Sequence, residues 1–413
     1  MASLRSNVFS LIILQGSNYL IPLLTLPYLT RVLGVEQYGV FGLTLAIAQY
    51  FVLFTDYGFN LTATKKIAQN QKDNNYISKV FWNTLLAKIF LCIISITAML
   101  VISRLFNESI TVDKLWLASL MVVGAALTPV WFFQGIEELS KVTLFSVTAK
   151  LMTLPLFFIF VRSSNDIVAA IVIQSLINFT SGIIALFLIY RMKSVTFSKP
   201  NLERIYFTIK EGSSVFIATL TISLYTISTP IILGLVSTVE QVSIFTAADR
   251  IKGAILGVFL ILGNAFFPRI NNMLSESRVE AFKLIKNILI SQIILCGIIG
   301  LSLYLFANYI TLILYGSEFI QVSEVFRAFS ILFVFVMTST VFGNYILLPL
   351  GLKKQYMITP MISAAIHIPL CSILGHYYGA VGGALSIVIV EIVTLVILTS
   401  ILVKKNIIQE VFR

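Results

Sequence analysis

Charged residues are scarce in this chain of 413 residues: Asp, Glu, Lys and Arg make up 11% of it, whereas hydrophobic residues make up 58%. A soluble globular protein carries about 25% charged residues, so the composition excludes an ordinary soluble domain and predicts an integral membrane protein. A membrane-spanning helix needs about 20 apolar residues, and the apolar stretches leave only short connections. No room remains for a soluble catalytic domain.

Cysteines and enzyme motifs are also scarce. The three cysteines, Cys92, Cys296 and Cys371, each fall in an apolar stretch without the spacing of a metal or redox site, so we expect packed side chains. The chain has no glycine-rich phosphate loop, no HExxH and no CxxC motif, which are signatures of nucleotide, zinc and redox sites. We therefore predict neither an enzyme nor a bound cofactor or metal.

The charge that is present is mostly positive, with 29 Lys and Arg against 18 Asp and Glu and a net charge of +11. In a soluble protein such an excess can indicate nucleic acid binding. In a chain this apolar it is better explained by basic cytoplasmic loops and by contact with anionic membrane lipids. We expect membrane lipids, and no nucleic acid, as partners.

Twelve apolar stretches, each long enough to cross a bilayer, lie between Val8 and Val403. The predicted spans are residues 8–32, 38–62, 80–103, 115–135, 142–161, 167–190, 213–236, 242–267, 288–307, 325–350, 357–376 and 380–403. With the N-terminus in the cytoplasm, 20 basic residues lie in cytoplasmic segments, five lie outside and four lie within spans. Cytoplasmic loops normally hold most Lys and Arg, so we expect both termini in the cytoplasm.

A weak internal repeat divides the spans into two groups of six. The sequence VEQYGVF at 35–41, after the first span, is similar to VEQVSIF at 239–245, after the seventh. Internal repeats are common in transporters. We therefore predict an all-α integral membrane fold of about twelve transmembrane helices in two six-helix lobes, residues 1–190 and 212–413, joined by a basic cytoplasmic linker at 191–211.

Four basic residues lie within predicted spans: Lys88, Lys150, Arg250 and Lys252. A charge in hydrocarbon is costly and normally faces a bundle interior or a water-filled cavity, so these residues indicate a lumen for an anionic substrate. The Arg250 guanidinium suits a diphosphate because it is planar and presents several donors. The alternative is that Asp249 pairs with Lys252 at helical spacing and that Arg250 is structural.

Other charged residues leave two interpretations open. Arg31, at the outer end of the first span, is either a further substrate contact or an interfacial anchor. Buried carboxylates can change charge during a transport cycle, which makes Asp56, Asp249 and Glu391 candidates for coupling to a H⁺ or Na⁺ gradient. The alternative is that Asp56 only ends a helix and that Asp249 only neutralises a basic neighbour.

Several motifs resemble those of one transporter family. They are PYLTRVLGVEQYG at 27–39, DYGF at 56–59 followed by KKIA at 65–68, and WFFQGIE at 131–137, with a looser match in YGAVGGA at 378–384. These segments resemble the Wzx-type O-antigen flippases, in the polysaccharide transporter branch of the multidrug/oligosaccharidyl-lipid/polysaccharide (MOP) exporter superfamily. The resemblance is strongest in the N-terminal part of the chain.

This resemblance implies a MATE-like fold, with two six-helix lobes around a central cavity. It also implies movement of an undecaprenyl-diphosphate-linked oligosaccharide from the cytoplasmic to the periplasmic leaflet of a bacterial inner membrane, through a cationic lumen and with an ion gradient as the driving force. An O-antigen polymerase and a chain-length regulator are the implied protein partners.

Two other classes of protein are weighed against the flippase. A membrane O-antigen polymerase or lipid-linked glycosyltransferase is similarly apolar, but such an enzyme is expected to have a long external loop. The longest connections here, 63–79, 191–212 and 268–287, are predicted to be cytoplasmic. A MATE-type drug exporter shares the expected fold, but its lumen is expected to hold carboxylates or aromatic residues instead of basic ones. The sequence therefore favours the flippase.

Overall fold

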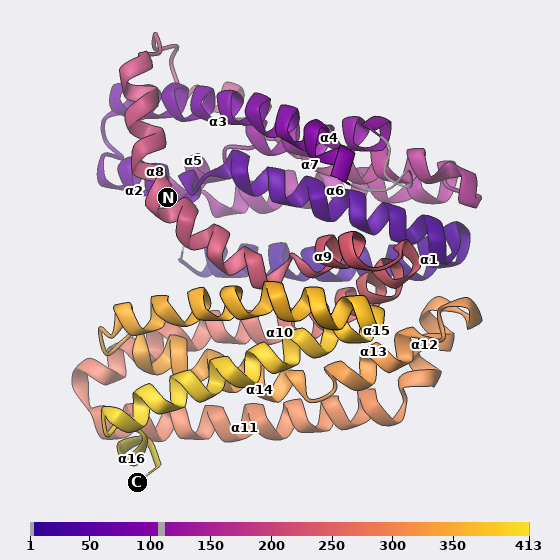
Figure 1. The fold of residues 1–413 in the computed structure, drawn as a ribbon. Coiled ribbons are helices and arrows are strands. Elements are labelled where there is room, and N and C mark those ends of the chain that lie inside the picture. Colours follow the sequence, from indigo (N-terminus) through magenta and orange to yellow (C-terminus); the bar gives the residue numbers. More distant parts are fainter. Residues whose placement is uncertain (1–3, 106–111, 413) are drawn as a thin grey trace. The chain divides into compact units, whose positions relative to one another are not determined.

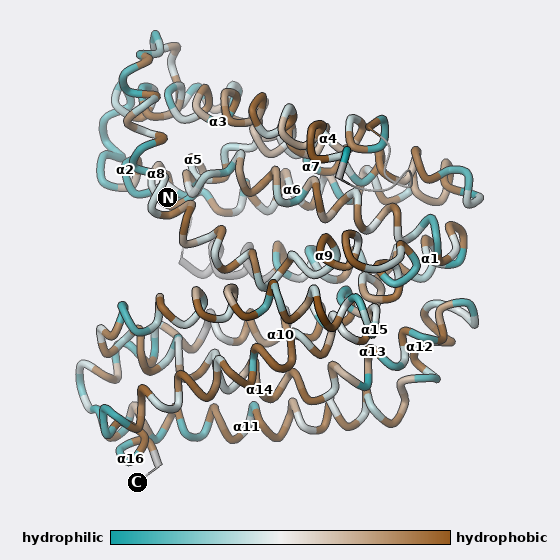
Figure 2. Tube along the Cα trace, in the orientation of Figure 1, coloured by the Kyte–Doolittle hydropathy of each residue, from teal (hydrophilic) through white to brown (hydrophobic). Residues whose placement is uncertain are grey.

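The computed structural model describes residues 4–105 and 112–412, and the regular elements in these ranges are all helices. The chain divides into two compact units, Met1–Leu220 and Thr221–Arg413, which we call unit 1 and unit 2. The long helices are hydrophobic along most of their length, and hydrophilic residues gather at their ends (Figure 2). The predicted all-α membrane fold is confirmed.

Unit 1 is a bundle of long helices joined by short turns (Figure 1). Its elements are α1 (Leu4–Asp56), α2 (Phe59–Gln69), α3 (Asn74–Ile102), the 3-10 turn η1 (Ser103–Leu105), α4 (Val112–Leu127), α5 (Val130–Gly135), α6 (Leu139–Phe160), the 3-10 turn η2 (Ser164–Asp166), α7 (Ile167–Met192) and the first part of α8 (Leu202–Thr226). α4 packs against α1, α3 and α7. Its contact with α7 is close because a Cβ on Gly124 would overlap the backbone of Asn178, and small residues let membrane helices approach.

α1 is too long to be a single span. Its 53 residues extend over about 80 Å at 1.5 Å per residue, whereas the hydrocarbon core of a bilayer is about 30 Å thick. Gly34 interrupts the helix with φ 70° and ψ 176°, a conformation that only glycine adopts without steric cost. α1 is therefore two spans, and the break falls in the connection at 33–37 that the sequence predicts.

The core of unit 1 around α5 is aromatic. Trp131, Phe132 and Phe133, all on α5, are completely buried. The ring of Phe132 lies edge-on to Phe81 of α3 at 5.5 Å between centroids, and Phe133 lies 5.5 Å from Phe145 of α6. A helix of six residues is not stable by itself, so these large rings hold α5 in place. The motif at 131–137 is thus a packing motif in this fold.

Unit 2 begins within α8 and has a similar bundle of long helices. Its further elements are α9 (Thr229–Val236), α10 (Val239–Glu276), α11 (Arg278–Leu305), α12 (Ala307–Tyr315), the 3-10 turn η3 (Ser317–Phe319), α13 (Val322–Phe329), α14 (Leu332–Thr340), the π-helix η4 (Val341–Leu347), α15 (Lys353–Lys404) and α16 (Ile407–Phe412). The axes of α13 and α14–η4 meet at 41°. π-helices are rare and are frequently found at functional sites, so η4 is a candidate part of the functional site.

α15 also consists of two spans. Its 52 residues are interrupted at Gly379, where φ is 56° and ψ is −132°. The side chain of Gln241, at the start of α10, closes the break: its Oε1 accepts a hydrogen bond of 2.8 Å from the backbone N–H of Ala380. The break falls in the connection that the sequence predicts between residues 376 and 380.

The described residues contain eight helices that are long and apolar enough to cross a membrane, or ten if each of two bent pairs is one span. The bent pairs are α8 with α9 and α13 with α14–η4. Because α1 and α15 each hold two spans, these residues give the twelve helices that the sequence predicts. The functional lobe boundaries, with the linker at 191–211, stay a prediction; in the structure α8 begins at Leu202 and lies in unit 1 up to Leu220.

Candidate functional site

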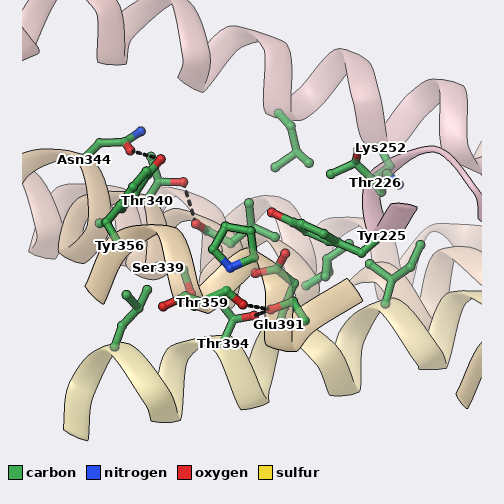
Figure 3. A pocket seen from close by; sticks show the side chains of 18 residues that line it. Tyr225, Thr226, Lys252, Ser339, Thr340, Asn344, Tyr356, Thr359, Glu391 and Thr394 are labelled. Atoms are coloured by element: carbon green, nitrogen blue, oxygen red, sulfur yellow. Dashed lines mark hydrogen bonds between the residues drawn. The ribbon is translucent and has the colours of Figure 1, made fainter. Parts of the chain in front are cut away.

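Unit 2 contains a partly open cavity of about 330 Å³ between its helices, lined by polar and apolar residues (Figure 3). Residues of α8, α10, α14, η4 and both halves of α15 line it. Most of its polar lining is hydroxyl and amide. The polar and charged lining residues are Tyr225, Thr226, Lys252, Ser339, Thr340, Asn344, Tyr356, Thr359, Ser363, Glu391 and Thr394. Groups of this kind can donate and accept hydrogen bonds to a sugar, or supply oxygen ligands to a cation.

Lys252 is the basic residue among the lining residues. Its side chain is 11% exposed and forms an ion pair with Asp249, one helical turn earlier on α10. Its Nζ also lies 5.1 Å from the centroid of the Phe329 ring, a cation–π distance. The local pair that the sequence left as the alternative is therefore present, and Lys252 faces the cavity as well.

Glu391 is the acidic residue of the lining and comes from the second half of α15. Figure 3 shows it between Tyr225 and Thr394. Lys252, on α10, lines the same cavity. The cavity therefore holds one basic and one acidic side chain from two different helices.

Hydrogen bonds connect the walls of the cavity. The hydroxyl of Tyr356 donates to Oδ1 of Asn344 at 2.9 Å, and the hydroxyls of Ser363 and Thr394 lie 2.7 Å apart. The second contact joins the two halves of α15. Among the described residues, the buried Oγ of Ser339 has no hydrogen-bond partner.

Arg250 does not line this cavity. It is exposed on α10, two residues before Lys252. Successive residues of an α-helix are rotated by about 100°, so positions 250 and 252 point to opposite sides of α10. The ligand role of Arg250 stays a prediction, and the structure does not bring it together with Lys252.

Lys88 is held deep inside unit 1. Its side chain is 1% exposed, and its Nζ forms an ion pair of 2.8 Å with Asp56. The same Nζ donates to the carbonyl oxygens of Ala125 at 2.6 Å and Thr128 at 3.2 Å. Asp56 ends α1, and Thr128 lies in the break between α4 and α5. Lys88 thus ties two helix ends together through three hydrogen bonds.

Lys150 and Arg31 have other surroundings in unit 1. Lys150, on α6, is half-buried and contacts Oδ1 of Asn18 and, at 3.5 Å, Oγ of Ser17, both on α1. Arg31 is exposed on α1, three residues before the break at Gly34. The structure therefore joins Lys88 with Asp56 and Lys252 with Asp249, and it brings Lys252 and Glu391 to one cavity.

Sequence reasoning missed the neutral polar lining of the cavity. These hydroxyls and amides come from spans far apart in the chain, and a single Thr or Ser in an apolar span is ordinary. A signal did exist in their spacing. Thr359 and Ser363 are four residues apart and Glu391 and Thr394 three apart, so each pair lies on one helix face and marks a polar stripe on an apolar span.

The chain matches the family of polysaccharide biosynthesis proteins over residues 4–274. It is 35% identical over 395 residues to a protein of Escherichia coli (strain K12) named "Putative O-antigen transporter", with 94% of each chain covered. A second relative of that name, from Shigella dysenteriae, is 30% identical over 389 residues, covering 94% of this chain and 97% of the relative. Both relatives carry the name of a transporter.

Solved structures give the fold. An inward-facing MATE family multidrug transporter of the MOP superfamily superposes with a TM-score of 0.71 at 16% identity, covering 94% of this chain and 96% of that one. The lipid II flippase MurJ in an inward closed conformation gives 0.71 at 14%, covering 98% and 88%. The chain is a multi-pass membrane protein that belongs to the polysaccharide biosynthesis protein family and has the fold of MOP superfamily transporters.

Proposed function

We propose that this protein is a flippase that moves an undecaprenyl-diphosphate-linked O-antigen oligosaccharide from the cytoplasmic to the periplasmic leaflet of a bacterial inner membrane. One observation carries the proposal: the identity of 35% over 94% of the chain to a protein named as an O-antigen transporter. The MATE-like and MurJ-like fold supports it because that architecture serves transport and not catalysis.

Alternating access is the proposed mechanism. The anionic head group enters from the cytoplasmic side, its charge is matched by basic side chains, and the polyprenyl tail stays in lipid. The cavity of unit 2 could bind part of this head group. Lys252 supplies a positive charge, and the surrounding hydroxyls supply hydrogen bonds for sugar or phosphate oxygens. Substrate then shifts the population of inward-open and outward-open states.

Coupling to an H⁺ or Na⁺ gradient is part of the proposal, and Glu391 is its proposed carrier. Of the three candidate carboxylates, Asp56 and Asp249 are each paired with a lysine. Glu391 lines the cavity with no ion pair among the described residues. A carboxyl group can exchange a proton or a cation during each cycle only if its charge is not already fixed by a partner.

The experiment is deletion of the gene in its own host, followed by analysis of surface polysaccharide and of lipid-linked intermediates. The proposal predicts loss of O-antigen from the surface and accumulation of the undecaprenyl-diphosphate-linked oligosaccharide, with recovery on reintroduction of the gene. An O-antigen polymerase would instead leave single repeat units on the surface. A drug exporter would leave O-antigen unchanged and raise sensitivity to cationic drugs, and either of these results contradicts the proposal.

A further inference from the structure

The segment at residues 190–210, from the end of α7 to the first turns of α8, presents basic and aromatic side chains together on the outside of unit 1. Its exposed large apolar residues are Tyr190 at 82%, Phe197 at 77%, Leu202 at 85%, Tyr206 at 62% and Phe207 at 50%. Its exposed basic residues are Arg191, Lys193, Lys199, Arg204 and Lys210. We call these ten residues the belt. Nothing in the proposed transport mechanism uses them.

Hydrogen bonds fix the position of the belt on α3. The backbone N–H of Thr196 donates to Oγ of Ser78 at 3.0 Å, and the indole Nε1 of Trp82 donates to the carbonyl oxygen of Thr196 at 3.1 Å. The ring of Phe197 packs edge-on against Trp82 at 5.4 Å. The connection at 193–201, which we call the strap, is therefore held against α3. The side chains on its outer surface have a fixed direction.

The first turns of α8 continue the strap as an amphipathic helix. Ile205, Thr208, Ile209 and Gly212 recur at helical spacing and are buried or half-buried against unit 1, whereas the belt residues of α8 face outward. A salt bridge between Lys66 and Glu211 holds this turn. In Figure 1 this part of α8 runs across the direction of α3 instead of along it, as a helix in the membrane plane does.

The positive charge of the belt indicates that its partner is anionic. Residues 190–211 contain five basic and two acidic residues, and one of the two acids, Glu211, is paired with Lys66. None of Lys193, Lys199, Arg204 and Lys210 forms an ion pair with another described residue. Aromatic rings settle at the headgroup level of a bilayer, and cations beside them attract anionic lipid.

We propose that the belt binds the anionic phospholipid headgroups of the cytoplasmic leaflet and so fixes the depth of unit 1 in the membrane. The proposal uses the predicted cytoplasmic orientation of residues 191–211 and is independent of the transported substrate. Trp82, packed under the belt, is a natural reporter of the lipid that gathers there. Of the other two tryptophans, Trp131 is completely buried and Trp116 is 58% exposed on α4.

The test measures quenching of Trp82 fluorescence by brominated lipid in a Trp116→Phe background. The full-length protein is reconstituted in phosphatidylcholine vesicles with a minor fraction of phosphatidylglycerol, and bromine is placed on the phosphatidylglycerol or on an equal amount of phosphatidylcholine. We expect brominated phosphatidylglycerol to quench at least about twofold more strongly, and high salt to remove the difference. The vesicles contain no polyprenyl lipid, so the transported substrate cannot produce the effect.

The belt variant carries Lys193→Gln, Lys199→Gln, Arg204→Gln and Lys210→Gln, all on exposed side chains, and it should lose the preference for phosphatidylglycerol. A control variant removes four exposed lysines elsewhere: Lys353→Gln, Lys354→Gln, Lys404→Gln and Lys405→Gln. It should keep the preference. Equal quenching by the two lipids in the background protein, a preference that survives in the belt variant, or an equal loss in the control would overturn the proposal.

Discussion

At the scale of single residues, two lysines buried in membrane helices have different roles. All three donors of Lys88 are used, by Asp56 and by two carbonyl oxygens at the end of α4. Lysine near a helix C-terminus also interacts favourably with the helix dipole. Lys252 has one carboxylate partner and an open cavity beside it. Lys88 is therefore a structural clamp, and Lys252 is available to a ligand.

The clamp makes a prediction about stability. Lys88→Met leaves Asp56 and two carbonyl oxygens without their donor, and an unsatisfied buried polar group costs about 1–3 kcal/mol. We expect the free energy of unfolding in detergent to fall by about 2–3 kcal/mol, measured by denaturation followed through tryptophan fluorescence. Lys72→Met, at an exposed lysine of the same unit, is the control and should change stability little. Equal stability of the two variants would refute the clamp.

A second residue-scale prediction concerns ion coupling. Glu391→Gln keeps the size of the side chain in the cavity but removes its charge, so transport in proteoliposomes should no longer respond to an imposed H⁺ or Na⁺ gradient. Glu276→Gln, at an exposed carboxylate at the end of α10, should keep the response of the unsubstituted protein. If Glu391→Gln still responds fully to both gradients, Glu391 is not the coupling group.

The sequence could predict one of the two buried ion pairs. Asp249 and Lys252 are one helical turn apart, so their contact follows from spacing on a single helix. Asp56 and Lys88 are 32 residues apart on different helices, and no periodicity reveals which spans face each other. For the same reason the cavity, whose lining comes from five helical elements, could not be assembled from the sequence.

At the scale of elements, glycines determine where the longest helices break. Gly34 and Gly379 have φ of 70° and 56°, values that other residues adopt only with strain. Both breaks were predictable because polar or small residues interrupt the apolar runs there. The part played by Gln241 was less accessible: the repeated VEQ motif indicated an equivalent place in two halves, but not the hydrogen bond to Ala380.

The break at Gly379 gives a prediction with a matched control. A Cβ on Gly379 would overlap the Gln241 side chain, and the backbone there is unsuitable for alanine, so Gly379→Ala should destabilise the protein by about 1–3 kcal/mol. Gly297 lies in the middle of α11, and a Cβ there meets nothing within 4 Å. Gly297→Ala should therefore be neutral or stabilising by up to about 1 kcal/mol. The measurement is the thermal unfolding temperature of each variant in detergent. A Gly379→Ala protein as stable as, or more stable than, the Gly297→Ala protein would contradict this account of the break.

At the scale of the whole molecule, the fold was the most predictable property. Length and hydropathy alone give the number of spans, because a bilayer demands apolar helices of a set length. Family membership followed from local motifs, and the match over residues 4–274 confirms it. The functional residues were less predictable. The position of a charged residue in the middle of a span shows that its charge needs a partner, but not whether that partner is another residue of the protein or the substrate.

The central claim is that the protein moves a lipid-linked oligosaccharide between leaflets and that Lys252 contributes to its binding. The most direct measurement reconstitutes purified protein in vesicles with a fluorescent undecaprenyl-diphosphate-linked oligosaccharide and follows the loss of label to a membrane-impermeant quencher. The account predicts protein-dependent transfer that slows by about tenfold in Lys252→Gln, as expected for one lost charge-assisted hydrogen bond, and is unchanged in Lys353→Gln. Transfer no faster than in protein-free vesicles, or an unchanged rate in Lys252→Gln, would contradict it.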